Sequence, residues 1–218
     1  MPTGGASLPD TSGGRRWGGE MVGDALEPVR GFVVGGQDAA ENEFPSQLSV
    51  QVQRPEEPPS YRHACGGVVL NQYWALTAAH CIASRLQDMS LLSVLSGTTR
   101  LHEGGTRHKL QAAVVHPGYD GDTLLHDICI LKVAEPFQLD GVKVAAATLP
   151  QQGQPVQDGA VATVVGWGLL QGDSGGPLFV DDVLVGLTSF SYGCARRNFP
   201  AVFTRVASYV DWIMQHIQ

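Results

Sequence analysis

The stretch Gln47-Leu-Ser-Val-Gln-Val-Gln53 alternates polar and apolar residues along its whole length. Side chains of a β-strand point alternately to opposite faces of the sheet, so a period of two is typical of a half-buried strand. An amphipathic helix would instead repeat its apolar residues every three to four positions. The stretch therefore predicts a β-strand that lies on a hydrophobic core.

Further strand-like runs follow along the chain, separated by turn signals such as Pro117-Gly118 and Gly121-Asp122. Many short strands at this spacing predict an all-β barrel or sandwich. The end of the chain differs, because apolar residues from Val206 to Ile217 recur at helical spacing and predict a helix that docks on the strands. The further strand-like runs are residues 65–70, 91–95, 110–116, 128–133, 160–166, 183–190 and 201–205.

Composition narrows the class of protein. The chain has 218 residues, which fits one domain and a tail. Its 21 acidic residues outnumber its 14 basic ones, and this net charge of −7 argues against a nucleic-acid binder. Hydrophobic residues make up 43% of the chain, so a sizeable core is possible. No apolar run approaches the roughly 20 residues of a membrane span.

Residues 1–32 have a composition of their own. The first 30 residues contain seven Gly and three Pro. Such a segment cannot bury enough surface to offset its ordering entropy, so it predicts a disordered, propeptide-like leader before a folded domain at 33–218. Its Arg15-Arg16 pair is interpreted as solvated charge, and the segment lacks the apolar core of a signal peptide.

The motif Gly172-Asp-Ser-Gly-Gly-Pro177 is the first candidate for chemistry. Its glycines allow a sharp turn that presents the Ser174 hydroxyl, with the backbone N–H groups of Gly172 and Ser174 pointing at one spot as an oxyanion hole. The alternative is a glycine-rich hairpin turn. The letters also fit the nucleophile elbow of α/β-hydrolases, but that elbow leads into a helix, which Gly175-Gly176-Pro177 opposes.

Two further motifs offer partners for a serine nucleophile. His80 lies in Thr77-Ala-Ala-His-Cys81, and histidine is the residue type best suited to act as a general base near neutral pH. Asp127 precedes an apolar strand, where a carboxylate can hold a histidine tautomer. Each residue alone is more often structural, so the case depends on all three motifs together.

Together the three motifs resemble the trypsin/chymotrypsin family of serine proteases, which has the same chain order of His, Asp and Ser. The resemblance extends from Val33 to Gln218. Its other motifs are Val33-Val-Gly-Gly36, Phe44-Pro45, Cys65-Gly-Gly67, Gly166-Trp-Gly168, the segment from Pro200 to Phe203 and the helix from Tyr209 to Ile213. The resemblance implies two antiparallel Greek-key β-barrels with a C-terminal helix, and a serine endopeptidase that needs no metal or cofactor.

The resemblance also implies a role for each site residue. His80 is the general base and acid, Asp127 orients it, and Ser174 attacks the peptide carbonyl. Cys65 and Cys81 form a disulfide around His80, although the four cysteines by themselves leave three pairings open. The implied substrate-binding residues are Gln171, Ser189, Phe190, Ser191 and Ala201, and the implied activation residues are a new N-terminus at Val33 and its partner Asp173.

One interval departs from the family pattern. Asp127 lies 47 residues after His80 and 47 residues before Ser174, whereas in the family the second interval is roughly twice the first. Only residues 169–171 separate Gly168 from the Ser174 motif. The absent stretch normally supplies two strands of the second barrel and part of the specificity pocket, so the second barrel is expected to be incomplete. The alternative function is therefore a catalytically inactive, truncated form that misfolds or acts as a binding or decoy protein.

The departures also bear on specificity. Ser191 and Ala201 occupy positions that are usually glycine in open pockets, so small aliphatic substrate side chains are expected. The implied partners are protein or peptide substrates and protease inhibitors, for a secreted monomer that binds neither nucleic acid nor membrane.

Six other side chains have simpler interpretations. Cys194 lacks its family partner and is expected to be an unpaired thiol, and Cys129 a buried one. His102, Glu103 and His108 are interpreted as solvated loop residues rather than metal ligands. His126, next to Asp127, is interpreted as incidental.

Overall fold

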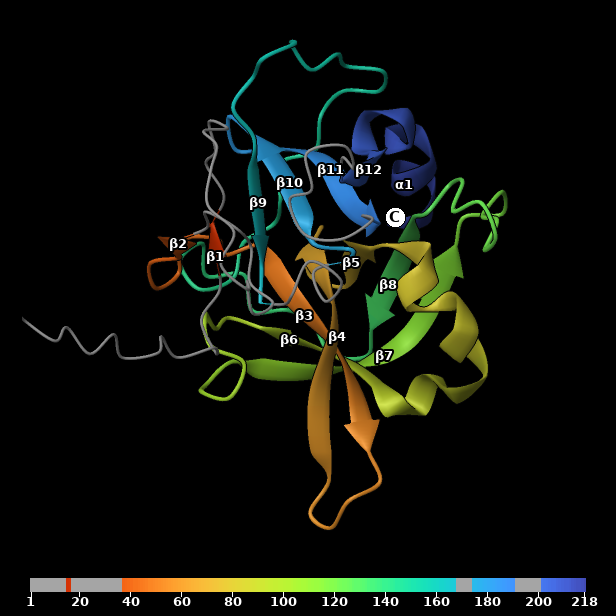
Figure 1. The fold of residues 1–218 in the computed structure, drawn as a ribbon. Coiled ribbons are helices and arrows are strands. Elements are labelled where there is room, and N and C mark those ends of the chain that lie inside the picture. Colours follow the sequence, from red (N-terminus) through yellow and green to blue (C-terminus); the bar gives the residue numbers. More distant parts are fainter. Residues whose placement is uncertain (1–14, 17–36, 168–173, 191–200) are drawn as a thin grey trace, which may run out of the picture.

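Six antiparallel strands close into a barrel in the first half of the chain, in the order β3-β4-β5-β8-β7-β6 (Figure 1). The structure, a computed structural model, describes residues 15–16, 37–167, 174–190 and 201–218. The barrel strands are β3 (Gln47–Arg54), β4 (Ser60–Val69), β5 (Trp74–Thr77), β6 (Leu92–Ser96), β7 (Thr106–Val115) and β8 (Cys129–Val133).

The alternation of polar and apolar residues in Gln47–Gln53 sets the orientation of β3. Leu48 and Val50 belong to the hydrophobic cluster inside the barrel. Ser49 and Gln51 point to the other face and are buried as well, because Ser49 Oγ lies 2.8 Å from His63 Nδ1 and Arg107 covers Gln51. The predicted strand is confirmed, and its polar face is covered by side chains rather than by water.

Four strands from the second half of the chain and two short strands from its N-terminal part form an open sheet, in the order β12-β11-β10-β9-β1-β2. This arrangement confirms an all-β fold with a closed first barrel and an incomplete second one. The sheet strands are β1 (Arg15–Arg16), β2 (Gln37–Asp38), β9 (Thr163–Gly166), β10 (Pro177–Val180), β11 (Val183–Phe190) and β12 (Val202–Arg205).

Strand β1 lies in the segment that the sequence predicted to be disordered. Arg15 pairs with Asp38 of β2 on one side and with Gly166 of β9 on the other. The backbone of Arg15–Arg16 therefore joins β2 to β9. The rest of residues 1–32 lies outside the described residues.

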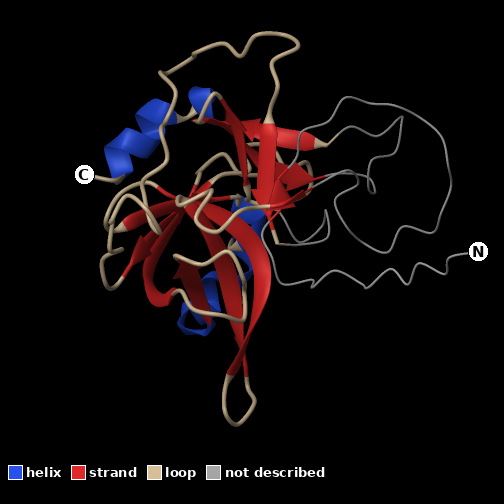
Figure 2. Ribbon diagram, turned by 90° about the vertical axis from the view of Figure 1, so that its left-hand side faces the viewer, coloured by secondary structure: helices blue, strands red, loops and turns tan. Residues whose placement is uncertain are grey.

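The C-terminal helix packs where the barrel meets the sheet, as Figures 1 and 2 show. Helix α1 (Val210–His216) follows the 3-10 turn η3 (Val206–Ser208) and buries Ile213 against Val68 and Leu76 of the barrel and Leu184 and Leu187 of β11. Two further 3-10 helices, η1 (Ala79–Cys81) and η2 (Ala83–Leu91), follow β5. Their existence was not predicted, whereas the C-terminal helix was.

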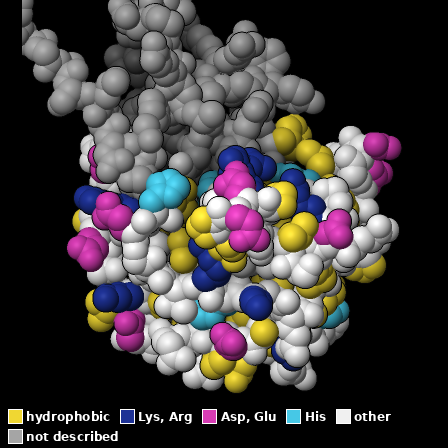
Figure 3. All heavy atoms as spheres, turned by 90° about the horizontal axis from the view of Figure 1, so that it is seen from below, with side chains coloured by type: hydrophobic (Ala, Val, Ile, Leu, Met, Phe, Trp, Pro, Cys, Tyr) yellow, Lys and Arg dark blue, Asp and Glu magenta, His cyan; other side chains and the backbone are white. Residues whose placement is uncertain are grey.

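The surface seen in Figure 3 carries Lys and Arg side chains interspersed with Asp and Glu. None of the helices in the described part of the chain has the length and apolar content of a membrane span.

Candidate functional site

Two neighbouring barrel strands bring His80 and Asp127 together. Strands β5 and β8 are antiparallel, and Thr77 pairs with Cys129. The end of β5 and the start of β8 therefore lie at the same end of the barrel. His80 follows β5 within η1, and Asp127 comes just before β8, so the strand register places the two side chains side by side.

The Asp127 carboxylate is 1% exposed and has three hydrogen-bond donors. His80 donates to it from the backbone N (2.9 Å) and lies with Nδ1 2.8 Å from Oδ2, while Ser189 Oγ donates at 2.5 Å. Burial alone would raise the pKa of Asp127, but the hydrogen bonds from His80 and Ser189 outweigh it and hold the pKa below its ordinary value. Asp127 is therefore a charged group that fixes the imidazole with its proton on Nδ1.

Ser174 lies on a turn held between the barrel and the open sheet. Gly66 of β4 donates to the Ser174 carbonyl at 2.9 Å, and Gly175 N donates to Thr188 O of β11 at 2.6 Å. Gly175 has a φ of +78°, and a Cβ there would collide with Thr77 Oγ1. A Cβ on Gly66 would lie 2.5 Å from Gly176 Cα. The glycines on both sides of this contact are thus required by close backbone approach.

Ser174 and His80 both lie close to Cys81 Sγ. Among the hydrogen bonds of the described residues, none joins the side chains of Ser174 and His80. Ser174 Oγ donates to Ser189 O at 3.4 Å, a long contact, and Ser174 is 9% exposed. His80 Nε2 lies 3.7 Å from Cys81 Sγ.

The predicted disulfide between Cys65 and Cys81 is confirmed. It joins β4 to η1 and so closes the loop that carries His80. Both sulfurs lie near the His80 imidazole, but as a disulfide they are not metal ligands.

The other site residues divide into those inside and those outside the described residues. Ser189 is buried on β11, and Phe190 ends the same strand, opposite Val202. Ala201 is exposed just before β12. Five predicted positions lie outside the described residues, namely Val33, Gln171, Gly172, Asp173 and Ser191, and so does Cys194.

The interpretation of His108 as a solvated loop residue is wrong. His108 is 2% exposed on β7, with Nε2 3.1 Å from Ser96 Oγ and Nδ1 3.2 Å from the Glu135 carbonyl. Burial lowers the pKa of His108. His102 and Glu103 do lie in an exposed turn. Cys129 is a free, buried thiol as predicted, and burial raises its pKa to about 12.

The lowered pKa of His108 predicts a loss of stability in acid. Below a pH of about 6.5 the unfolded chain binds a proton at this imidazole before the folded chain does, so the free energy of unfolding falls as pH falls. The loss is up to about 1.4 kcal/mol per pH unit for one proton. We expect urea unfolding at pH 7.5 and 5.5 to show a smaller loss for His108→Gln than for wild type. An unchanged loss in His108→Gln, or an equal reduction in the exposed control His102→Gln, would contradict this.

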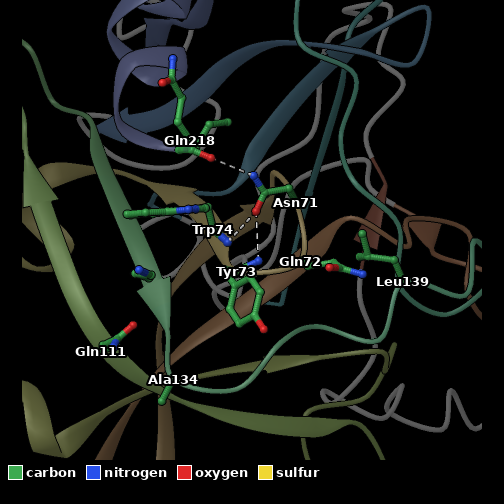
Figure 4. Close-up of a pocket in the computed structure, with 10 residues that line it drawn as sticks. Asn71, Gln72, Tyr73, Trp74, Gln111, Ala134, Leu139 and Gln218 are labelled. Carbon is green, nitrogen blue, oxygen red and sulfur yellow. Dashed lines mark hydrogen bonds between the residues drawn. The ribbon is translucent and has the colours of Figure 1, made fainter.

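A hollow of about 700 Å³ lies away from this site, between the start of β5 and the C-terminus (Figure 4). Asn71 organises it, since its side-chain oxygen accepts from the backbone N of Tyr73 and Trp74 and its Nδ2 donates to Ile217 O. His80, Asp127 and Ser174 do not line this hollow.

Known proteins match most of this chain. The family model described as Trypsin matches residues 33–171 and 169–213, two blocks that meet where the sequence predicts the missing stretch. Trypsin from Phaedon cochleariae is 28% identical over 236 residues, covering 85% of this chain and 88% of its own. Trypsin Tyr p 3.0101 from Tyrophagus putrescentiae is 31% identical over 236 residues, covering 84% of this chain and 79% of its own.

A solved structure agrees on the fold. The scabies mite inactivated protease paralogue S-I1 has a TM-score of 0.67 and 24% identity, and the match covers 81% of this chain and 96% of that one. At this identity the likeness concerns the fold alone.

Proposed function

Because the chain belongs to the trypsin family of serine proteases, we propose that it is a serine endopeptidase. Proteases of this family act on protein substrates. One observation carries the proposal: the buried Asp127 carboxylate accepts two hydrogen bonds from His80, beside the turn that bears Ser174. This arrangement supports a Ser174–His80–Asp127 triad.

The reaction would proceed through an acyl-enzyme. Asp127 keeps the His80 proton on Nδ1, which leaves Nε2 free to take the proton of Ser174 as Oγ attacks the peptide carbonyl carbon. Backbone N–H groups of Gly172 and Ser174 would stabilise the resulting oxyanion. His80 then protonates the leaving amine, and water hydrolyses the Ser174 ester by the same steps in reverse.

The substrate would lie along β11. Ser189 and Phe190 end this strand close to Ser174, which supports their proposed role in pairing with the substrate backbone. Gln171, Ser191 and Ala201 complete the proposed binding positions. Ser191 and Ala201 each carry a Cβ at a position that is usually glycine in open specificity pockets. We propose that these Cβ atoms narrow the pocket, which would favour small aliphatic side chains of the substrate.

Membership of the same family supports proposals for the activation and the location of the enzyme. We propose that an α-amino group at Val33 pairs with Asp173, and that residues 33–218 form the protease domain. The Cys65–Cys81 disulfide supports a secreted protein, because such bonds persist in oxidising compartments. The proposed enzyme is a monomer, open to protein inhibitors that mimic its substrates.

Labelling with a fluorophosphonate probe tests the proposal. The full-length chain, and the same chain cut before Val33, are treated with the probe and analysed by intact mass, with Ser174→Ala as control. We expect one adduct on Ser174 and none on the control, because only an activated serine attacks the phosphorus. The absence of any adduct on both forms, when circular dichroism shows them folded, would overturn the proposal.

A further inference from the structure

The residue just before the Asp127 carboxylate has an unusual backbone. His126 has a φ of +53°, in the left-handed region that costs roughly 1 kcal/mol or more for a residue with a Cβ. Its carbonyl accepts from Ile128 N at 2.8 Å, so the chain turns tightly around Asp127. The direction of the Asp127 side chain therefore depends on what holds His126 in this conformation.

The His126 side chain is clamped even though much of it is exposed. Its Nδ1 lies 3.0 Å from the hydroxyl of Tyr209. One face of its imidazole stacks on His116, with ring centroids 4.8 Å apart and planes at 17°. His116 is itself fixed, since its Nδ1 accepts from Gly118 N at 3.1 Å. The segment around His116 and the residue Tyr209 thus hold the His126 ring from two sides.

Tyr209 ties this clamp to the C-terminal helix. Tyr209 is the N-cap residue of α1: Ile213 N donates to its carbonyl at 2.8 Å, and its own N donates to Val206 O at 2.9 Å. Ile213 and Val206 are fully buried in the cluster between barrel and sheet. The Tyr209 hydroxyl is therefore a fixed point to which the His126 ring is attached.

We propose that His126 is a positioning residue for Asp127, and that Tyr209 of the C-terminal helix anchors it. The side-chain clamp holds the left-handed turn, and the turn aims the buried carboxylate at His80 Nδ1. The part of this inference that concerns catalysis rests on the proposed function. The direction of the Asp127 carboxylate, by contrast, can be measured even in a protein without activity. The interpretation of His126 as incidental is replaced by this role.

The test uses His126→Ala, which removes the clamp, and His126→Asn, which tolerates a left-handed backbone and keeps a side chain able to bond Tyr209. Tyr209→Phe removes only the hydroxyl. His102→Ala is the control, because His102 lies in an exposed turn between β6 and β7.

The first readout is the proton NMR signal of His80 Nδ1–H, which is assigned by its loss in His80→Ala. This signal reports the hydrogen bond to Asp127 whether or not the protein is active. The second is kcat and KM on a peptide substrate.

We expect His126→Ala and Tyr209→Phe to shift or broaden the Nδ1–H signal and to lower kcat about tenfold with KM within about twofold, since a small misplacement of a catalytic group slows the reaction rather than binding. His126→Asn and His102→Ala should match wild type in both readouts. An unchanged Nδ1–H signal in His126→Ala would overturn the inference. A wild-type chain without activity but with the expected signal changes would overturn the proposed function and leave the positioning role supported.

Discussion

Replacing Asp127 by Asn is expected to lower kcat by about 10⁴-fold while the chain remains folded. The carboxylate accepts hydrogen bonds from His80 N, His80 Nδ1 and Ser189 Oγ. An amide offers one acceptor oxygen and turns an NH₂ group toward one of these donors. The imidazole then favours the tautomer with its proton on Nε2, which cannot take the proton of Ser174.

The measurement is kcat on a peptide substrate, or the rate of fluorophosphonate labelling of Ser174, at constant pH. Asp122→Asn is the matched control, because Asp122 lies in the exposed loop a few residues before Asp127 and lacks its buried contacts. Near-equal rates for Asp127→Asn and Asp122→Asn would show that Asp127 does not orient His80. The melting temperature of each variant separates loss of chemistry from loss of fold.

Introducing proline at both positions of β1 is expected to destabilise the open sheet by about 2–5 kcal/mol. Each Arg→Pro change removes a backbone N–H from a strand that lies between β2 and β9. A lost backbone hydrogen bond is worth about 1 kcal/mol, and a partner left unsatisfied adds about 1–3 kcal/mol. The exposed edges of β2 and β9 would also favour association between molecules.

Urea unfolding and light scattering measure these two effects in Arg15→Pro/Arg16→Pro. The matched control is Arg15→Ala/Arg16→Ala, which removes both charges and keeps the backbone ladder, and we expect it to behave as wild type. Equal destabilisation by the two double variants would assign the effect to the charges and contradict the role of the ladder. A chain lacking residues 1–32 should resemble the proline variant. A chain that is cut before Val33 but in which residues 1–32 stay bound should keep the backbone hydrogen bonds of β1 to β2 and β9.

Local patterns predicted the elements of the fold well where neighbouring residues decide them. The alternation in Gln47–Gln53 reports which face meets the core, so β3 followed from it. The run from Val206 to Ile217 predicted α1 for the same reason, although its first turn is the separate η3. Strand β1 could not be predicted, because Arg15–Arg16 has no apolar pattern and its place depends on a free edge of β9 about 150 residues away.

The candidate site was predictable only as a set of motifs. His80 and Asp127 were chosen by residue type and family pattern, and the structure brings them within hydrogen-bond distance. The short hydrogen bond from Ser189 Oγ to Asp127 joins residues 62 positions apart, and the sequence around either residue does not predict it. His108 was misread because its surroundings in sequence are polar, while its burial comes from Glu135 and Phe137 beyond the strand.

The division of the chain into a closed barrel and an open sheet also separates the residues of the proposed triad. His80 and Asp127 belong to the barrel, in which every strand has a neighbour on both sides, whereas Ser174 precedes β10 of a sheet with two edges in the described strands. Hydrogen-bonded units of unequal stability open independently. The less stable unit therefore limits how long such a molecule keeps its native structure: a preparation can lose the alignment of Ser174 while the barrel, and most of its spectroscopic signature, persists.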